Sequence, residues 1–147
     1  MHELVKSAKT DPIFINLIKY IIRHCTPRDH EGELKTIYNA WYNKIKYLRD
    51  PHQVENLQSV WETIKNRAGD CDCTAVLIAS SVGAIGYPYR FVTIKADSSR
   101  KDEFSHIFTQ ASQPGKGWVT MDISLRSPDY GFTPTGWEHK YWPEPVY

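Results

Sequence analysis

The sequence predicts an α+β fold in which helices come first along the chain and an antiparallel sheet follows. Before Gly69 the apolar residues repeat at helical spacing, and after Gly86 the pattern is typical of short strands separated by turns. An apolar stretch between them, from Ala75 to Ile85, predicts a central buried helix packed on the sheet. The chain has 147 residues, a length typical of one domain, so we expect a single domain over residues 1–147.

Two helices are expected near the start of the chain, and each carries its own sequence signal. Asp11 and Pro12 open the first, because Asp is a favoured N-cap and Pro a favoured first helical residue. The second is indicated by apolar residues that share one helical face, namely Leu34, Ile37, Tyr38, Trp41 and Ile45. Asp50 and Pro51 are expected to end this second helix.

Two more helices are expected before the strands begin. Ser59 and Glu62 form a capping box, in which each residue satisfies a backbone N–H at the start of a short helix. The central helix follows at Cys71, where a loop meets the first helical turn. Gly86 is its expected C-terminal cap, and Pro88 prevents it from continuing.

The second half of the chain contains three predicted strands, at Tyr89–Ala96, Phe104–Ala111 and Gly117–Ile123. The tail that begins at Ser127 is rich in proline and aromatic residues but has little periodicity. We therefore expect the tail to wrap the surface of the domain rather than to fold separately.

Charge and composition exclude several functional classes. Eighteen Lys and Arg against seventeen Asp and Glu give a formal charge of +1, so we expect no nucleic-acid partner and no anionic membrane partner. No apolar stretch is long enough to span a membrane, and the N-terminus does not resemble a signal peptide. The three cysteines, Cys25, Cys71 and Cys73, are accordingly expected to be reduced thiols of a cytoplasmic protein.

Cys71 is the residue best suited to chemistry. At a helix start, unpaired backbone N–H groups and the helix dipole favour a thiolate over a thiol. The dipole contributes only about 0.3–1 kcal/mol, so an activated cysteine also needs a nearby imidazolium. The alternative is a structural thiol, because free cysteines are among the most buried residues.

His106 and Asp122 are the best candidates to activate Cys71. Each is a polar residue in a mainly apolar predicted strand, and the two strands are consecutive. Adjacent antiparallel strands can place them side by side, so that the carboxylate orients the imidazole and the imidazole activates the thiol. The residues themselves leave two alternatives open: a core histidine at position 106 and a strand-end cap at position 122.

Cys71 and Cys73 do not form a zinc motif. Structural zinc sites use two to four residues between paired cysteines and a second pair of ligands, whereas one residue separates these two. A helix turns by about 200° over two residues, so Cys73 is expected to point away from Cys71 as a packed thiol. We expect no metal and no cofactor.

Four motifs, taken together and in order, carry a family resemblance: Gly69–Ala75 (GDCDCTA), Gly86–Val92 (GYPYRFV), Phe104–His106 (FSH) and Gly117–Asp122 (GWVTMD). The combination resembles the transglutaminase-like superfamily, above all its small bacterial and phage or prophage members that are described as cysteine peptidases. The resemblance covers about residues 10–125. Cys73 departs from the pattern, because many relatives carry an acidic residue there.

The resemblance implies a papain-like α+β fold and acyl transfer through a thioester. By position it makes Cys71 the nucleophile, His106 the general base and acid, and Asp122 the residue that orients the imidazole. The backbone N–H of Cys71 would form part of an oxyanion hole, and either Gln58 or Trp61 is a candidate for the second donor. Residues that would line the substrate groove are Asp72, His52 and Trp137.

Arg90 corresponds to the arginine that follows the proline in this family. We expect it to make a structural ion pair rather than to take part in catalysis.

The function that the resemblance favours is a cysteine peptidase or amidase that hydrolyses a peptide or isopeptide bond. Its substrate would be a protein or a peptide, cell-wall peptides included, and its location would be the cytoplasm or a phage particle. Two alternatives stay open: cross-linking of amides, if an amine rather than water reaches the thioester, and a non-catalytic binding or structural module. The sequence does not determine the substrate or the oligomeric state.

Overall fold

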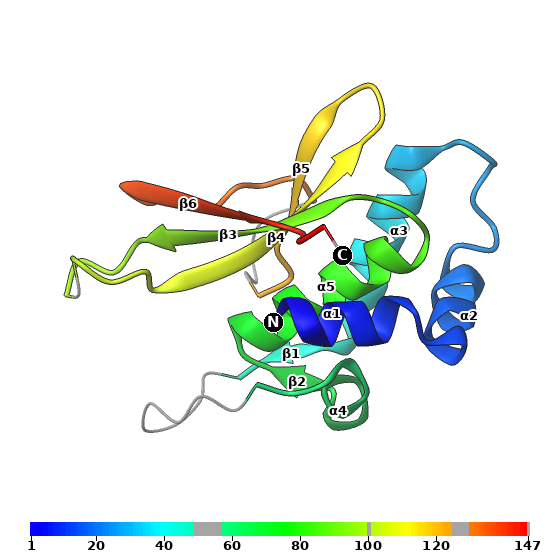
Figure 1. The fold of residues 1–147 in the computed structure, drawn as a ribbon, viewed down its shortest axis with the longest axis horizontal. Coiled ribbons are helices and arrows are strands. Elements are labelled where there is room, and N and C mark those ends of the chain that lie inside the picture. The colour runs from blue at the N-terminus through cyan, green and yellow to red at the C-terminus, as the bar shows by residue number, and fades with distance from the viewer. Residues whose placement is uncertain (49–56, 100, 125–129, 147) are drawn as a thin grey trace.

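The computed structural model describes residues 1–48, 57–99, 101–124 and 130–146. It has the expected α+β architecture, in which the helices gather on one side of a four-stranded antiparallel sheet (Figure 1). Helix α5 (Cys71–Ala84) packs both on the sheet and on the other helices, so it occupies the centre of the molecule.

Among the described residues, four helices precede the central one, and two of them begin where their capping residues predict. Their bounds are His2–Lys9 for α1, Pro12–Ile21 for α2, His30–Lys44 for α3 and Val60–Asn66 for α4. The carboxylate of Asp11 accepts from the N–H of Ile13, and the hydroxyl of Ser59 accepts from the N–H of Glu62. Both predicted starts are therefore confirmed, and α3 buries the predicted face through Leu34, Ile37, Tyr38 and Trp41. The expected end at Asp50 and Pro51 is wrong, because α3 ends at Lys44 and the extended strand β1 follows it.

Helix α1 and a small parallel ladder were not expected from the sequence. Helix α1 buries only Val5 and Ala8, which is too short an apolar repeat to mark a helix by itself. Strands β1 (Lys46–Tyr47) and β2 (Ala68–Gly69) pair in parallel, so the segment after α4 is a strand and not only the end of a helix. Strands of two residues are too short to show an alternation of apolar and polar side chains. The ladder forms because two segments that are distant in sequence meet in space.

Helix α5 is the predicted central helix. Asp70 is its N-cap, with a side-chain oxygen that accepts from the N–H of Cys73 at 3.1 Å. Every residue from position 73 to position 82 is buried, which confirms the expected all-round burial. Gly86 follows the helix with φ +94°, a backbone conformation that favours glycine, so its role in ending the helix is confirmed.

The three predicted strands are present and neighbour one another in the expected order. They are β3 (Tyr89–Lys95), β4 (His106–Gln113) and β5 (Gly117–Met121), and the order in the sheet is β5-β4-β3-β6. One face packs on α5 and contributes Tyr89, Phe91, Ile107 and Ala111 to the main core.

The C-terminal tail both wraps the sheet and extends it, which corrects the expectation that it only wraps. Before β6, the chain passes so closely over Ile94 that a Cβ on Gly136 would lie 3.2 Å from the Ile94 Cβ. Strand β6 (Glu138–Pro143) then pairs antiparallel with β3. All six residues of β6 are exposed, so no alternation of apolar and polar residues marks the strand in the sequence.

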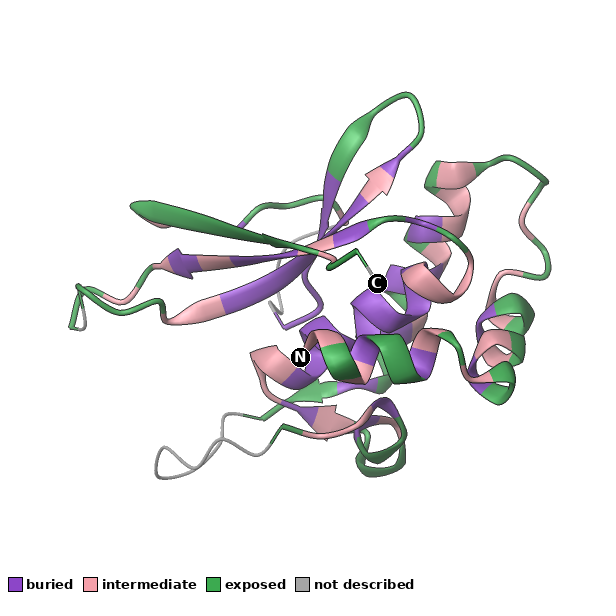
Figure 2. Cartoon of the chain, in the orientation of Figure 1, coloured by how far each residue is buried: buried purple, intermediate pink, exposed green. Residues whose placement is uncertain are grey.

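Burial is concentrated where α5 meets the sheet. Figure 2 shows buried residues along α5, β3 and β4, and exposed residues along β6. Within the described ranges, no helix combines the length and the hydropathy that crossing a membrane requires.

Candidate active site

His106 and Asp122 are in direct contact, as the strand order predicts. His106 is the first residue of β4, and Asp122 follows the last residue of β5. The His106 Nε2 donates to Oδ2 of Asp122 at 2.6 Å, and only 17% and 2% of these two side chains are exposed. The pair is therefore largely shielded from water.

The second carboxylate oxygen of Asp122 is held by Ser124. Its Oδ1 accepts from the Ser124 N–H at 3.0 Å and from the Ser124 hydroxyl at 2.6 Å. Asp122 thus caps the turn after β5 and also contacts the imidazole. Sequence reasoning missed Ser124, although an Asp followed two residues later by Ser is typical of a local turn of this kind.

Cys71 completes the group from the start of α5. Its half-buried side chain lies close enough to the His106 ring to raise the pKa of the imidazole. An imidazole has two ring nitrogens, so with Nε2 bonded to Asp122 the nitrogen left for another partner is Nδ1. His106 therefore lies between a carboxylate and a thiol.

The surroundings of His106 favour its protonated form. Burial alone would lower the pKa of the imidazole, but the hydrogen bonds to Asp122 and Cys71, together with their negative charges, raise it to about 9. At neutral pH the ring is mainly an imidazolium, which is the form that stabilises a neighbouring thiolate.

A buried hydrogen bond joins α5 to β4 close to this group. The Thr109 hydroxyl donates to the carbonyl oxygen of Ala75 at 2.8 Å. Ala75 lies about one helical turn after Cys71, and Thr109 lies on the same strand as His106. The sequence carries no signal for this contact, because it depends on how the helix lies across the strand.

Cys73 is a packed thiol on another side of α5, as expected. Only 2% of the residue is exposed, and burial, partly offset by an N–H donated by Gln58, raises the pKa of the thiol to about 11. A Cβ on Gly69 would lie 2.7 Å from the Cβ of Cys73. Position 69 must therefore be glycine for β2 to run this close to the first turn of α5.

The first turn of α5 leaves a backbone donor beside Cys71. Asp70 accepts from two N–H groups, that of Cys73 through its side chain and that of Thr74 through its carbonyl oxygen. Within the described residues, the N–H of Cys71 has no such acceptor.

The two candidates for a second oxyanion donor are placed differently. Gln58 lies against the start of α5, because its backbone N–H reaches the Cys73 thiol and its side-chain oxygen accepts from Thr63 at 3.2 Å. The Trp61 ring N–H instead donates to Asp11 at 3.2 Å, at the start of α2. The single donor of Trp61 is thus already engaged.

Of the three candidate groove residues, the structure describes Asp72 and Trp137. Asp72 is half-buried in the first turn of α5, next to the thiol in sequence. Trp137 is 54% exposed and is tied to the β3 edge by bonds from its backbone N–H to Lys95 and from its ring N–H to Lys101. His52 lies outside the described residues.

Arg90 has a structural role, but the expected ion pair is replaced by ring contacts. Its guanidinium lies 4.4 Å from the Trp118 ring centroid and 4.2 Å from that of Tyr141, and Nε donates to Gln110 at 2.8 Å. Arg90 thereby connects residues of all four strands of the sheet. Such cation–π contacts stabilise a partly desolvated guanidinium.

A family model described as the transglutaminase-like superfamily matches residues 16–123, a range that contains Cys71, His106 and Asp122. A comparison with curated proteins finds no match.

Two solved structures have a similar fold. A candidate cysteine protease from Cytophaga hutchinsonii aligns with a TM-score of 0.61 at 22% identity, over 76% of this chain and 37% of that chain. A candidate protease from Parabacteroides distasonis aligns with a TM-score of 0.60 at 13% identity, over 91% of this chain and 31% of that chain. The chain therefore spans about a third of the length of these two proteins, and the likeness establishes the fold.

Proposed function

Because the chain belongs to the transglutaminase-like superfamily, we propose that it is a thiol-dependent acyl-transfer enzyme of the cysteine peptidase or amidase type. The proposed reaction is hydrolysis of a peptide or isopeptide bond in a protein or peptide substrate. One observation carries the proposal: His106 is hydrogen-bonded to Asp122, and Cys71 lies close enough to the same ring to raise its pKa.

In the first half of the proposed reaction, the Cys71 thiolate attacks the carbonyl carbon of the substrate amide. A C–S bond forms, and the carbonyl electron pair moves to oxygen. Nδ1–H of the His106 imidazolium then protonates the leaving amine, and the C–N bond breaks to leave a thioester. Asp122 stays ionised and keeps the ring oriented through Nε2.

In the second half, neutral His106 takes a proton from water as the water oxygen attacks the thioester. The C–S bond breaks, the acid product leaves, and the thiolate and the imidazolium are restored. Hydrolysis is favoured over amine transfer because both similar solved structures are described as candidate proteases.

The oxyanion of each tetrahedral intermediate requires donors near the start of α5. We assign the first to the N–H of Cys71, which has no acceptor among the described residues. We assign the second to the side-chain amide of Gln58, since Gln58 contacts the first turn of α5 whereas the ring N–H of Trp61 is bonded to Asp11.

The test is the alkylation rate of each cysteine with iodoacetamide, resolved by mass spectrometry from about pH 5 to about pH 9. Cys25 is a matched internal control, because it is also half-buried but its thiol contacts the hydroxyl of Thr36 and not an imidazole. We expect Cys71 to react at least about tenfold faster than Cys25 below about pH 7, and to lose this advantage in His106→Ala. Equal rates for the two cysteines would contradict the proposal.

A further inference from the structure

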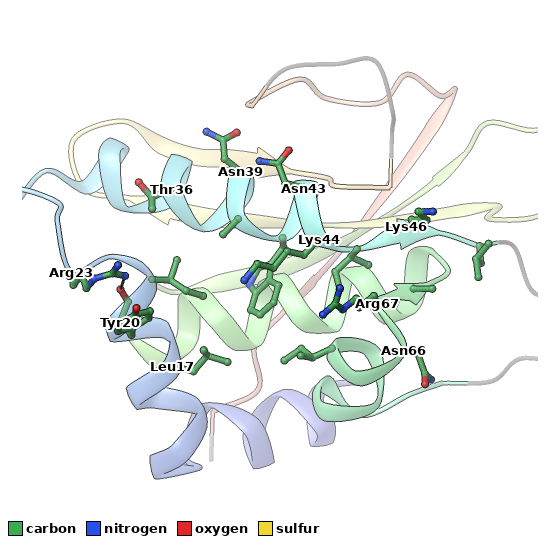
Figure 3. A pocket seen from close by; sticks show the side chains of 17 residues that line it. Leu17, Tyr20, Arg23, Thr36, Asn39, Asn43, Lys44, Lys46, Asn66 and Arg67 are labelled. Carbon is green, nitrogen blue, oxygen red and sulfur yellow. Dashed lines mark hydrogen bonds between the residues drawn. The ribbon is translucent and has the colours of Figure 1, made fainter.

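A large pocket lies apart from the proposed active site, between α2, α3 and α4 (Figure 3). Its volume is about 1190 Å³, and its lining residues include none of Cys71, His106 and Asp122. Pockets that hold organic ligands or peptide side chains are usually about 300–1,000 Å³, so this one is large enough for more than a small ion. The proposed reaction makes no use of it.

The floor of the pocket is apolar and parts of its rim expose large apolar side chains. Its apolar lining includes Leu17 and Ile21 of α2, Ile64 of α4 and the buried Trp41 of α3. At the rim, Tyr20 is 61% exposed and Leu48 is 59% exposed. Exposed apolar residues gathered around a concave surface are typical of binding sites rather than of ordinary solvated surface.

The charged groups of the pocket all have the same sign. Among the described residues, its lining contains four cations, Arg23, Lys44, Lys46 and Arg67, and no carboxylate. In Figure 3, Lys44 and Arg67 lie over the middle of the pocket from opposite walls, and Arg23 lies at its α2 end.

None of these four cations makes an ion pair within the described residues. Some lysines elsewhere in the described residues do pair with carboxylates, as in Lys9 with Glu144 and Lys95 with Glu138. A chain with a net charge of only +1 thus has, on one concave surface, four cations without an ion pair among the described residues, although the Arg23 guanidinium also lies 3.8 Å from the Tyr20 ring centroid. Like charges repel at short range, so an anionic partner would stabilise this arrangement.

We propose that this cationic groove, defined by Arg23, Lys44, Lys46 and Arg67 around the apolar floor, binds an acidic polypeptide segment that also carries apolar side chains. The carboxylates of the segment would meet the four cations, and its apolar side chains would cover Leu17, Ile21 and Ile64. A lone phosphate would leave the floor uncovered. A nucleic acid would gain little from aliphatic floor residues, because bases bind proteins mainly by stacking on aromatic rings.

The proposal is tested by fluorescence anisotropy with a short fluorescein-labelled peptide that alternates Glu and Leu. Two companion peptides replace every Glu by Gln, or every Leu by Ser. We expect wild-type protein to bind the Glu/Leu peptide and to lose at least about tenfold in affinity for either companion, with binding that weakens as salt rises. Equal affinity for the three peptides would overturn the proposal.

The matched variants remove three positive charges inside or outside the groove. The groove variant combines Arg23→Gln, Lys44→Gln and Arg67→Gln, and the control combines Lys19→Gln, Lys35→Gln and Lys65→Gln. The control residues are exposed, lie on α2, α3 and α4 near the groove residues in sequence, and do not line the pocket. We expect about tenfold weaker peptide binding in the groove variant only. An equal loss in both variants would show a nonspecific effect of net charge and would overturn the proposal.

Two further measurements keep the result decisive. Arg67 has φ +53°, a left-handed backbone conformation in which a substitution can disturb the fold. If the triple variant does not fold, the double variant Arg23→Gln/Lys44→Gln replaces it and leaves Arg67 unchanged. Hydrogen–deuterium exchange of wild-type protein with the Glu/Leu peptide should show protection in residues 36–46 and 64–68. Protection confined to other segments, or tighter binding of a labelled single-stranded DNA than of the peptide, would contradict the proposal. None of these readouts depends on catalysis by Cys71.

Discussion

The Thr109 hydroxyl donates to the carbonyl oxygen of Ala75 at 2.8 Å, in a buried contact between β4 and α5. Thr109 shares its strand with His106, and Ala75 lies about one helical turn after Cys71. This one bond therefore connects the strand of the proposed base with the helix of the proposed nucleophile. We infer that it sets the separation of the sulfur and the imidazole.

Thr109→Val, which keeps the shape of the side chain but removes the hydroxyl, should weaken this connection. We expect a loss of about 1–2 kcal/mol in the free energy of unfolding, measured in urea, because a buried hydrogen bond is lost. The alkylation rate of Cys71 below about pH 7 should fall as well. Thr109→Ser keeps the hydroxyl and should preserve the fast Cys71 reaction. An unchanged Cys71 rate in Thr109→Val would show that the bond does not position the helix.

Asp122→Asn should strongly reduce turnover of any peptide or isopeptide substrate. The amide removes the negative charge that helps to keep His106 protonated and changes how the ring is oriented, so we expect kcat/KM to fall by about 10²–10⁴-fold. Ser124→Ala is the matched control, because it removes only one of the two hydrogen bonds to Oδ1. Its loss should be much smaller, and equal losses in the two variants would assign the effect to the turn rather than to the charge.

The raised pKa of His106 predicts how stability changes with pH. Its pKa rises from 6.5 to about 9 on folding, so the protonated ring stabilises the folded state fully below about pH 6.5. This contribution is lost as pH rises through about 9. Wild type should therefore exceed His106→Gln in free energy of unfolding, measured in urea, by an amount that shrinks by at most about 3 kcal/mol between about pH 6.5 and about pH 9.

Cys71→Ala provides the control for that titration. The hydrogen bond and the charge of Cys71 both contribute to the raised pKa of His106, so their removal should lower the pH at which the ring loses its proton. The His106 ring signals followed by NMR would report this change directly. A wild-type advantage that grows with pH, or a titration that Cys71→Ala leaves unmoved, would contradict the assigned contacts.

Gly69→Ala should destabilise the start of α5. The added Cβ would lie 2.7 Å from the Cβ of Cys73, so the helix or β2 must shift, at an expected loss of about 1–3 kcal/mol in thermal or urea unfolding. Gly83→Ala, on the same helix, meets only the flexible side chain of Lys9 and should be neutral or slightly stabilising. Equal stability of the two variants would show that β2 can move without loss.

Most helices and strands of the fold follow from local sequence signals. Asp11, Ser59 and Gly86 mark helix ends through their own backbone chemistry, and the structure places them as expected. The strands β3, β4 and β5 follow from β-forming residues between turns. The contact between His106 and Asp122 was also predictable, since neighbouring antiparallel strands bring such residues together.

The strands that sequence reasoning missed show no alternation of apolar and polar residues. Strand β6 is exposed along its whole length and exists because β3 offers it an edge. The β1–β2 ladder has two residues in each strand and depends on the ends of α3 and α4 meeting. The ring contacts of Arg90 join residues from β3, β5 and β6, so an ion pair was the natural but incorrect expectation.

The order of α2 to α5 and of β3 to β5 therefore follows from the sequence alone, as do the caps at Asp11, Ser59 and Gly86, because they depend on side-chain period and on bonds between residues close in the chain. The three residues proposed for catalysis follow from the family resemblance. The fold alone established the bond from Thr109 to Ala75, the bond from Trp61 to Asp11, and the gathering of Arg23, Lys44, Lys46 and Arg67. Those features join segments far apart in the chain, and a hydrogen bond or a charge cluster between such segments exists only once packing has brought them together.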